Sequence, residues 1–268
     1  QDNFDHVESL CFQCKLCWVV CPYTEPHEYD LDVPSLFQRS KFQRIKKHGT
    51  SFQDKLLADQ DRLGQVARVV APVVNLINQS SMARQAMSLV SDIHKHAPLP
   101  KYFTQTFEKW FQGKFADSIA YPVNEPVKKV AFFTSCTVNY NAPEIGKSAV
   151  EVLLRNNVQV LLPEQVCCGM PMIETGDISG TERKMSYNIS RLKKLVDQGY
   201  DIVTPSPTCA FTLRKQYAQY STDTASPEKI AANTYEFSHY LVEMARQKTL
   251  DRNFTRGLGT VSAHVACH

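Results

Sequence analysis

The spacing of hydrophobic residues along the chain changes from a helical to a strand-like pattern near residue 127. Beyond this point, short apolar runs that fit buried strands alternate with amphipathic stretches that fit helices. The strands are expected at 127–135, 158–162 and 200–204, the helices at 143–155, 180–198 and 227–247, and a last strand around 260–264. Such alternation predicts parallel strands joined by right-handed crossovers, which is an α/β layer fold.

The first half of the chain lacks this alternation. Residues 52–96 repeat their apolar positions at helical spacing. Within them, the apolar stretch 66–77 is expected to pack against the core or a partner, with contact to a membrane surface as the alternative. Residues 98–126 contain several prolines and aromatic residues, which predicts an extended connector whose aromatic side chains hold it to a surface. We place the domain boundary near Glu125.

Size and charge narrow the classes of function. The 268 residues, 43% of them hydrophobic, can form one substantial core with a small additional domain. With 30 basic and 27 acidic residues, the formal charge is only +3, too small to indicate nucleic acid as a partner. No stretch approaches the roughly 20 consecutive apolar residues that cross a bilayer, and no segment resembles a signal peptide. We therefore expect a cytoplasmic protein that is soluble or peripheral at the inner face of the cytoplasmic membrane.

Four of the nine cysteines lie close together near the N-terminus, at Cys11, Cys14, Cys17 and Cys21, and Pro22 follows the last of them. Thiolates at this spacing wrap one loop around a 4Fe-4S cluster, so that three sulfurs reach three iron atoms. In two-cluster ferredoxins the fourth cysteine serves a neighbouring cluster, so Cys21 either does this or completes the same cluster. The alternatives are a zinc knuckle, which normally ends with a second cysteine pair or histidines, and a disulfide-linked loop. An odd number of cysteines suits a reducing compartment in which thiols are kept for metal.

The other five cysteines follow the predicted strands. Cys136 comes after the first strand, Cys167 and Cys168 after the second, Cys209 after the third and Cys267 after the last. Because ligand sites of open parallel sheets form at the carboxyl ends of the strands, we expect these thiols at one edge of the sheet. Gly169 permits a positive-φ turn that lets two adjacent thiolates face one metal centre. The alternative for each cysteine taken singly is an inert buried residue.

The pattern Cys-x30-Cys-Cys-Gly, with a further cysteine about 40 residues on, resembles the cysteine-rich CCG domain of iron-sulfur redox proteins. This family includes the B component of heterodisulfide reductase, the iron-sulfur subunits of glycolate and lactate oxidases, and the C component of anaerobic glycerol-3-phosphate dehydrogenase. The chain resembles this last component in the stretches given next. The resemblance extends from Cys11 to His268 and is carried by APVVNLINQSS, LPKYFTQTFEKWF, VAFFTSCTVNYNAPEIGKS, VCCGMPMIETG and SPTCAFTLRKQY. In this family a two-cluster ferredoxin domain precedes two CCG repeats.

The chain departs from that plan in three respects. No ferredoxin-type run precedes Cys11, and only the opening of a second repeat, around Cys267, is present, so we expect the sequence to be part of a longer polypeptide. In the closing Cys-x2-Cys of the repeat, Ser206 stands in place of the first cysteine, which argues against the disulfide-cleaving chemistry of heterodisulfide reductases. The expected organisation is a partial ferredoxin-like (α+β) domain at 1–50, a helical and aromatic connector at 51–125, a CCG α/β domain with a parallel sheet at 126–259, and the start of a second repeat at 260–268.

The resemblance implies an electron-transfer subunit of an oxidoreductase complex and not the subunit that oxidises the substrate. A flavoprotein dehydrogenase supplies electrons, and a quinone or another membrane-associated acceptor takes them. One or two 4Fe-4S clusters are expected, the first on the N-terminal cysteines and the second on Cys136, Cys167, Cys168 and Cys209, with Cys267 as a candidate ligand of the truncated repeat. Zinc is the alternative at the CCG site, and no catalytic residue is assigned. The alternative functions are a thiol or disulfide reductase like heterodisulfide reductase, and a zinc-stabilised scaffold.

Two further motifs have ordinary structural explanations. Gly146-Lys147-Ser148 follows a strand and opens a helix, but Asn141 stands where a phosphate loop requires glycine. Glu174 and Asp177, just after the second strand and its cysteine pair, are expected to cap the next helix.

Overall fold

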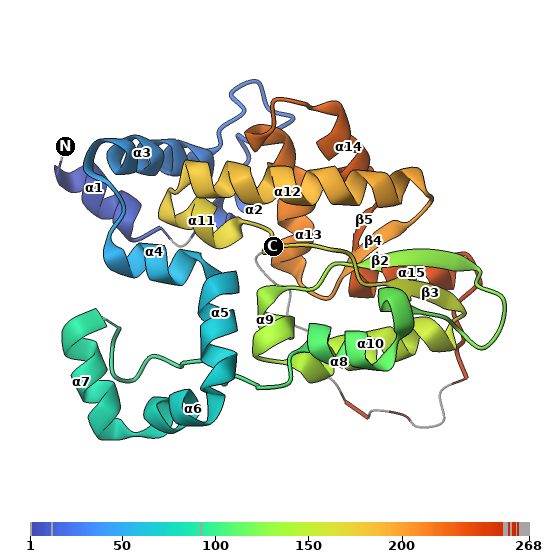
Figure 1. Cartoon of the computed structure of the whole chain (residues 1–268). Helices are drawn as coiled ribbons and strands as arrows, with labels where there is room; N and C mark the ends of the chain where they lie inside the picture. Colours follow the sequence, from blue (N-terminus) through green and yellow to red (C-terminus); the bar gives the residue numbers. More distant parts are fainter. Residues whose placement is uncertain are drawn as a thin grey trace.

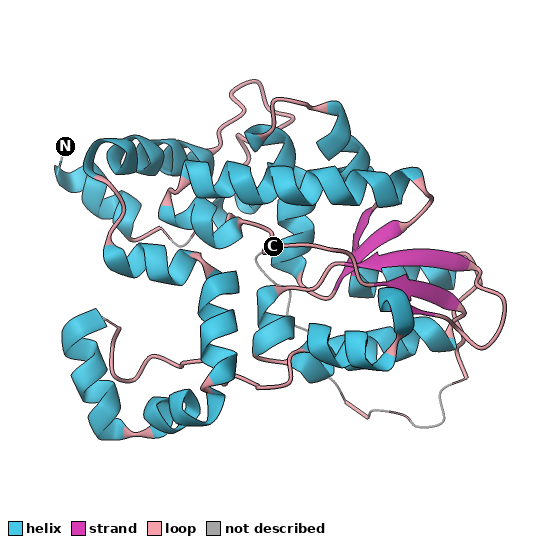
Figure 2. Cartoon of the chain, in the orientation of Figure 1, coloured by secondary structure: helices cyan, strands magenta, loops and turns pink. Residues whose placement is uncertain are grey.

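A five-stranded sheet lies at the centre of the second half of the molecule, and helices cover both of its faces (Figure 1, Figure 2). The computed structural model describes residues 2–11, 13–91, 93–253, 257, 259, 260 and 262. The first half of the chain is helical and lies beside this body (Figure 1). The α/β class predicted for the second half is therefore confirmed.

The sheet has the strand order β1-β3-β2-β4-β5. Its strands are β1 (Ile119–Ala120), β2 (Lys128–Phe132), β3 (Val158–Leu161), β4 (Asp201–Thr204) and β5 (Thr234–Glu236). β2 to β5 are parallel, in a register that pairs Val130 with Val160 on one side and with Asp201 on the other, whereas β1 runs antiparallel to β3. Because β3 and β4 lie on opposite sides of β2, the direction of winding reverses at β2. This reversal is the topological switch point at which open α/β sheets bind ligands.

Helices pack on both faces because alternate residues of a strand point to opposite sides of the sheet. The helices are α8 (Phe107–Lys114), α10 (Pro143–Arg155), α12 (Ile178–Asp197), α14 (Ala225–Ala232) and α15 (Phe237–Arg246). Val130 and Phe132 of β2 face a core shared with α8, α10 and α15. Ala131 and Phe133 face a second core shared with α12 and α14. Since both faces are buried, β2 and β4 contain consecutive apolar residues, Val130 to Phe132 and Ile202 to Val203.

The single helix expected over 227–247 is wrong. The chain instead forms α14, then β5 as the fifth strand of the sheet, and then α15. The threonine and tyrosine of β5 are good strand formers, and Glu236 caps α15 by accepting the N–H groups of Ser238 and His239. Three residues are too few to interrupt a helical pattern visibly, so the strand was missed. The strand predicted at 260–264 lies largely outside the described residues.

The extended connector expected over 98–126 is also incorrect. Thr106 caps helix α8 by accepting the N–H of Lys109, and a short 3-10 turn, Ala116–Ser118, leads into β1. Phe107 and Phe111 are fully buried in the core beside the sheet, so these aromatic side chains build the core and do not hold a linker to a surface. Their spacing places both on one face of a helix, and this face packs more area than an extended strand could.

The first fifty residues form three helices, α1 (Asp2–Ser9), α2 (Leu16–Val20) and α3 (Val33–His48). No strand occurs among the described residues of this segment, so the α+β character expected for 1–50 is not found there. A strand needs a partner for its backbone groups, and the residues between α2 and α3 form turns instead. Helix α3 is fixed to the body, because Lys41 Nζ donates a hydrogen bond to the Glu174 carbonyl (2.7 Å) and the Phe42 ring contacts Tyr220.

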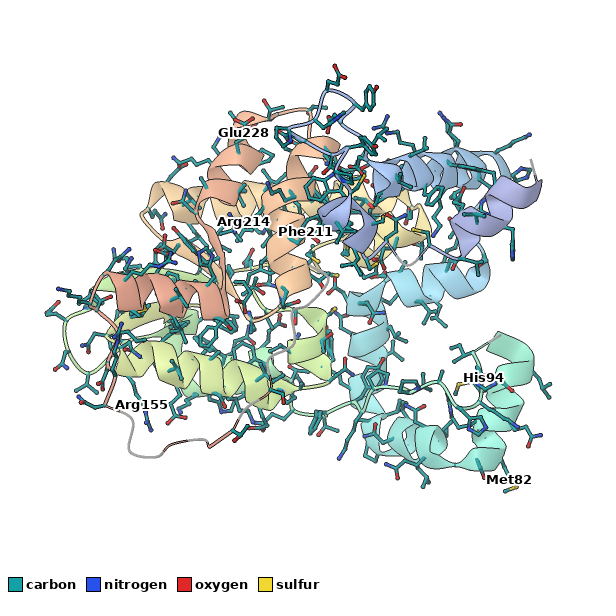
Figure 3. All side chains as sticks on the ribbon, turned by 180° about the vertical axis from the view of Figure 1, so that it is seen from behind. Met82, His94, Arg155, Phe211, Arg214 and Glu228 are labelled. Carbon is teal, nitrogen blue, oxygen red and sulfur yellow. The ribbon has the colours of Figure 1, made fainter. Side chains whose placement is uncertain are left out.

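The helical pattern expected over 52–96 is confirmed, but it is divided into four short helices. These are α4 (Phe52–Ala58), α5 (Gln60–Val69), α6 (Ala71–Gln79) and α7 (Ser81–Ser91). Helices α6 and α7 project from the body as an arm, on which Met82 is labelled in Figure 3. Within 66–77, Ala67 and Ala71 are buried, but Val66 and Leu76 are 62% and 69% exposed, so only the small residues of this stretch pack on the body and its packing against a partner stays a prediction. In the described part of the chain, no helix combines the length and apolar character that a membrane span requires.

Candidate metal centre at the sheet edge

Four cysteines meet where β2, β3 and β4 end. Cys136 begins helix α9 (Cys136–Tyr140) after β2, Cys167 and Cys168 precede helix α11 (Met170–Thr175) after β3, and Cys209 lies in helix α13 (Pro207–Phe211) after β4. The Sγ atoms of Cys168 and Cys209 are 3.6 Å apart, and hydrogen bonds link the thiol of Cys167 to those of Cys136 and Cys168. The structure thus brings these four thiols to one edge of the sheet, as the strand pattern predicts.

Local geometry explains how two adjacent cysteines face the same site. Gly169 has a φ of 96°, the left-handed conformation expected from the sequence, and it is the N-cap residue of α11. We call residues 167–169 the CCG turn. Serines cap the helices that follow the neighbouring strands β2 and β4. Ser135 caps α9 by accepting the N–H of Val138, and Ser206 caps α13 by accepting the N–H of Cys209 (3.4 Å). Ser206, which replaces a cysteine of the family pattern, therefore acts as a helix cap.

Two amide side chains, the fully buried Asn188 and the half-buried Gln165, hold the segment that leads into the CCG turn. Asn188 of α12 accepts the N–H of Val166 (3.0 Å), and its Nδ2 donates to the carbonyls of Val166 (3.1 Å) and Cys167 (3.3 Å) and to the hydroxyl of Tyr217 (2.9 Å). Gln165 pairs with both backbone groups of Thr134, which precedes Cys136. These bonds tie the segment after β3 to α12 and to the segment after β2.

The thiols of Cys136, Cys167 and Cys168 differ in acidity. Hydrogen bonds from Cys136 and Cys168, and a further one from the Gly169 N–H, hold the pKa of Cys167 well below its usual value in spite of its burial. Hydrogen bonding to Cys167 together with burial raises the pKa of Cys136 and of Cys168. Burial and the neighbouring Cys168 likewise raise the pKa of Tyr217. The Cys167 thiol is thus more acidic than those of Cys136 and Cys168, and metal binding would release protons from these two.

Residues from two distant parts of the chain form an ion pair that contacts the backbone of the CCG turn. Asp61 of α5 accepts the Cys167 N–H (2.9 Å), and Lys184 of α12 contacts Asp61 Oδ2 (2.5 Å) and Asp59 Oδ1 (3.0 Å). Burial raises the pKa of Asp61, and the Lys184 ammonium opposes this shift. Burial acts to lower the pKa of Lys184, but the two carboxylates outweigh it and the pKa is raised.

The N-terminal cysteine loop, residues 11–21, lies against the same region. Gln13 and Lys15 have positive φ values of 53° and 58°, which curl the backbone around Cys14. Lys15 Nζ lies 4.4 Å from the centre of the Phe211 ring on α13, and Figure 3 shows Phe211 beside α2. Burial at this contact lowers the pKa of Lys15. The loop that carries the first set of cysteines therefore contacts the helix that carries Cys209.

The donor set of the sheet edge fits an iron-sulfur group in its chemistry. Four soft thiol ligands of this kind are what such clusters use. The Thr134 hydroxyl is buried at the same edge without a hydrogen-bond partner, so it could donate to a sulfide. Within the described ranges, no three histidine, cysteine or acidic side chains surround a single ion position, and this applies to the N-terminal cysteines as well. The thiols at the sheet edge contact one another.

The remaining sequence expectations have mixed outcomes. Asp177 caps α12 by accepting the N–H of Gly180 (2.9 Å), as expected. Gly146 packs against Phe107 and Val138 with no room for a Cβ, which gives this glycine a packing role in α10. Cys267 lies outside the described residues.

Sequence reasoning missed the supporting side chains of the site. Asp61 and Lys184 are more than a hundred residues apart in the chain, and no local pattern connects them. Asn188 is one of three polar residues, with Thr181 and Lys184, on the buried face of the amphipathic helix α12, and this polarity was the one signal available for it.

A mostly parallel sheet with four cysteines at its switch point defines this part of the chain as a cysteine-rich α/β domain. Residues 130–214 match the sequence model of the cysteine-rich domain family named CCG, and this range begins in β2 and includes all four clustered cysteines. The chain therefore contains a cysteine-rich CCG domain, and the predicted resemblance is confirmed.

Several proteins are similar to this chain over longer ranges. It is 31% identical over 195 residues to the C component of the anaerobic glycerol-3-phosphate dehydrogenase of Escherichia coli K12, which covers 71% of this chain and 47% of the relative. It is 32% identical over 145 residues to lactate utilization protein A of Bacillus cytotoxicus and of Bacillus cereus, which covers 52% of this chain and 57% of each relative. The chain thus spans about half the length of the curated relatives that it matches. No solved structure matches it.

Proposed function

We propose that this chain is an electron-transfer part of an oxidoreductase complex and carries single electrons from a flavoprotein dehydrogenase towards a quinone or another acceptor. The observation that carries the proposal is the convergence of Cys136, Cys167, Cys168 and Cys209 at the switch point of the sheet. The names of the similar proteins, one a part of a dehydrogenase and the other a lactate utilization protein, support an association with substrate oxidation.

Two groups of cysteines would hold the redox centres. Cys11, Cys14 and Cys17 would bind a first 4Fe-4S cluster, with Cys21 as the fourth ligand of this cluster or as a ligand of another. The four cysteines of the sheet edge would bind a second cluster. When bound, such clusters accept and release one electron at a time at potentials set by charge, hydrogen bonds and solvent access.

The protein's own residues provide the support for this chemistry. The N–H of Gly169 and the hydroxyl of Thr134 are donors available to sulfur, and the backbone amides near Gln13 and Lys15 are natural donors in the first loop. The second site lies in a buried, apolar part of the body, since Cys167, Cys168 and Cys209 belong to the second core. Such burial excludes water from the centre and limits side reactions with solvent.

The contact of Lys15 with Phe211 supports a relay between the two sites. It places the first cysteine loop directly on α13, whose Cys209 belongs to the second site. In this proposal the substrate is oxidised on the partner flavoprotein, and this chain receives the electrons. We place the complex in the cytoplasm, with the acceptor at the inner face of the membrane.

Rapid mixing tests this function. The anaerobically purified full chain is mixed with a glycerol-3-phosphate dehydrogenase flavoprotein and its substrate, and the visible absorbance of the iron-sulfur protein is followed before and after addition of a water-soluble quinone. We expect bleaching that needs both dehydrogenase and substrate, and recovery with quinone. Absence of bleaching with this dehydrogenase and with a lactate-oxidising flavoprotein would contradict the proposal. The Cys168→Ser variant is the matched control, and it should lose the part of the bleaching that belongs to the second site.

A further inference from the structure

Helix α5 lies outside the sheet domain in sequence but contacts its cysteine site at two points. In its first turn, Asp61 accepts the hydrogen bond of the Cys167 N–H. One turn further on, Gly64 lies against the Tyr140 ring so closely that no Cβ fits between them, and Tyr140 ends the helix that Cys136 begins. Helix α5 therefore supports the first two cysteine-bearing segments of the site.

The charges at this contact are partly shielded from water. The Lys184 side chain is 10% exposed and that of Asp61 is 24% exposed, and their charged atoms are 2.5 Å apart. Asp59 adds a second carboxylate to the same ammonium at 3.0 Å. Charges in such surroundings act more strongly on their neighbours than exposed pairs do, because less water screens them.

We propose that Asp61 and Lys184 are positioning residues that fix the CCG turn and set the reduction potential of the redox centre bound there. The proposal rests on the proposed function, since it assumes that the four cysteines hold a redox centre. Asp61 acts through the backbone of Cys167, and Lys184 acts through Asp61. Neither residue needs to contact the metal atoms.

The two charges affect the centre in opposite directions. Reduction adds an electron and makes the centre more negative. The Asp61 carboxylate opposes this addition, and the Lys184 ammonium favours it. Asp61→Asn keeps an oxygen that accepts the Cys167 N–H but removes the negative charge, so the potential should rise. Lys184→Gln leaves two carboxylates without their ammonium, so the potential should fall. In the double variant the two shifts should partly cancel.

A redox titration of the full chain, monitored by paramagnetic resonance, measures these potentials at one fixed pH. The matched controls are Asp197→Asn and Lys229→Gln, which alter an exposed ion pair whose aspartate lies on the same helix α12 as Lys184. We expect opposite shifts for the two test variants and no shift for the controls. Shifts in the same direction, or shifts no larger than those of the controls, would overturn the proposed control of the potential.

Two additional measurements keep the proposal testable if Lys184→Gln does not fold. Asp59→Asn removes the more exposed carboxylate without touching Cys167, and it should raise the potential less than Asp61→Asn does. In the metal-free protein, Asp61→Ala should speed hydrogen exchange of the Cys167 amide about tenfold or more, because a hydrogen bond to a charged acceptor is lost. Unchanged exchange would overturn the positioning role.

These outcomes separate the present inference from the proposed function. If the wild-type chain binds no redox centre at the sheet edge, both proposals fail. If the centre is present and transfers electrons, but the two charge variants leave its potential unchanged, only the inference about Asp61 and Lys184 fails.

Discussion

Asn188 offers the sharpest test of how the CCG turn is held in place. Its side chain is fully buried and makes four hydrogen bonds, to Val166 N–H, to the carbonyls of Val166 and Cys167, and to the Tyr217 hydroxyl. Asn188→Ala removes all four and leaves buried backbone groups without partners. Hydrogen bonds contribute about 1 kcal/mol each, and an unsatisfied buried group costs about 1–3 kcal/mol. We therefore expect a loss of about 3 kcal/mol in the free energy of unfolding.

Urea unfolding of the metal-free protein under reducing conditions, followed by circular dichroism, measures this loss without interference from irreversible cluster loss. The matched control is Asn124→Ala, which removes one exposed hydrogen bond to Asn157 and should change the stability by no more than about 0.5 kcal/mol. Because Asn188 also binds the Cys167 carbonyl, its alanine variant should retain less iron at the sheet edge after reconstitution. Equal stability of the two variants would refute the assigned role of Asn188. A stability loss with unchanged iron content would refute its role in shaping the site.

Three further predictions concern the core, the CCG turn and the sheet. Phe107→Ala should lower the free energy of unfolding by about 3–5 kcal/mol because it empties a fully buried position in the first core; a loss below about 1 kcal/mol in urea unfolding would contradict this packing. Gly169→Ala should lower the free energy of unfolding by about 1–2 kcal/mol and reduce bound iron, since its φ of 96° strains any residue with a Cβ. Full iron content of this variant in metal analysis would contradict the role of the CCG turn in iron binding. Burial raises the pKa of Asp201 against the opposing effects of Lys128 and Tyr240, so its contribution to stability is greatest below about pH 4 and falls as pH rises through the folded-state pKa. In wild-type protein this contribution makes the urea midpoint fall as pH rises through that range. Asp201→Asn should reduce this pH dependence of the midpoint, whereas the control Asp197→Asn should leave it in place.

Much of the sheet domain could be predicted because its strands are buried on both faces. The apolar residues of β2, β3 and β4 are clustered in sequence, with Gln159 alone interrupting those of β3, and parallel pairing follows from the helices between the strands. The edge location of the cysteines follows from the same reasoning. Strand β5 could not be predicted, because its three residues are held by pairing with β4 and by no pattern of their own.

The environment of the cysteines was less accessible from sequence. Asp61 reaches Cys167 only because α5 packs on α9 through Gly64 and Tyr140, a contact between segments far apart in the chain. The exposed arm shows the converse limit: an apolar pattern such as that of α6 predicts a helix but does not specify what covers its apolar face. Long-range packing, and not local periodicity, decides both features.

The central claim is that two separate sets of thiols hold iron-sulfur clusters, and metal analysis tests it most directly. Iron, sulfide and zinc are determined in the anaerobically purified chain and in the variants Cys14→Ser and Cys168→Ser, with paramagnetic resonance of each reduced sample. We predict iron and sulfide in equal amounts in the wild type, loss of one signal in Cys14→Ser, and loss of the other in Cys168→Ser. Zinc in place of iron, or the loss of both signals in either variant, would contradict the account.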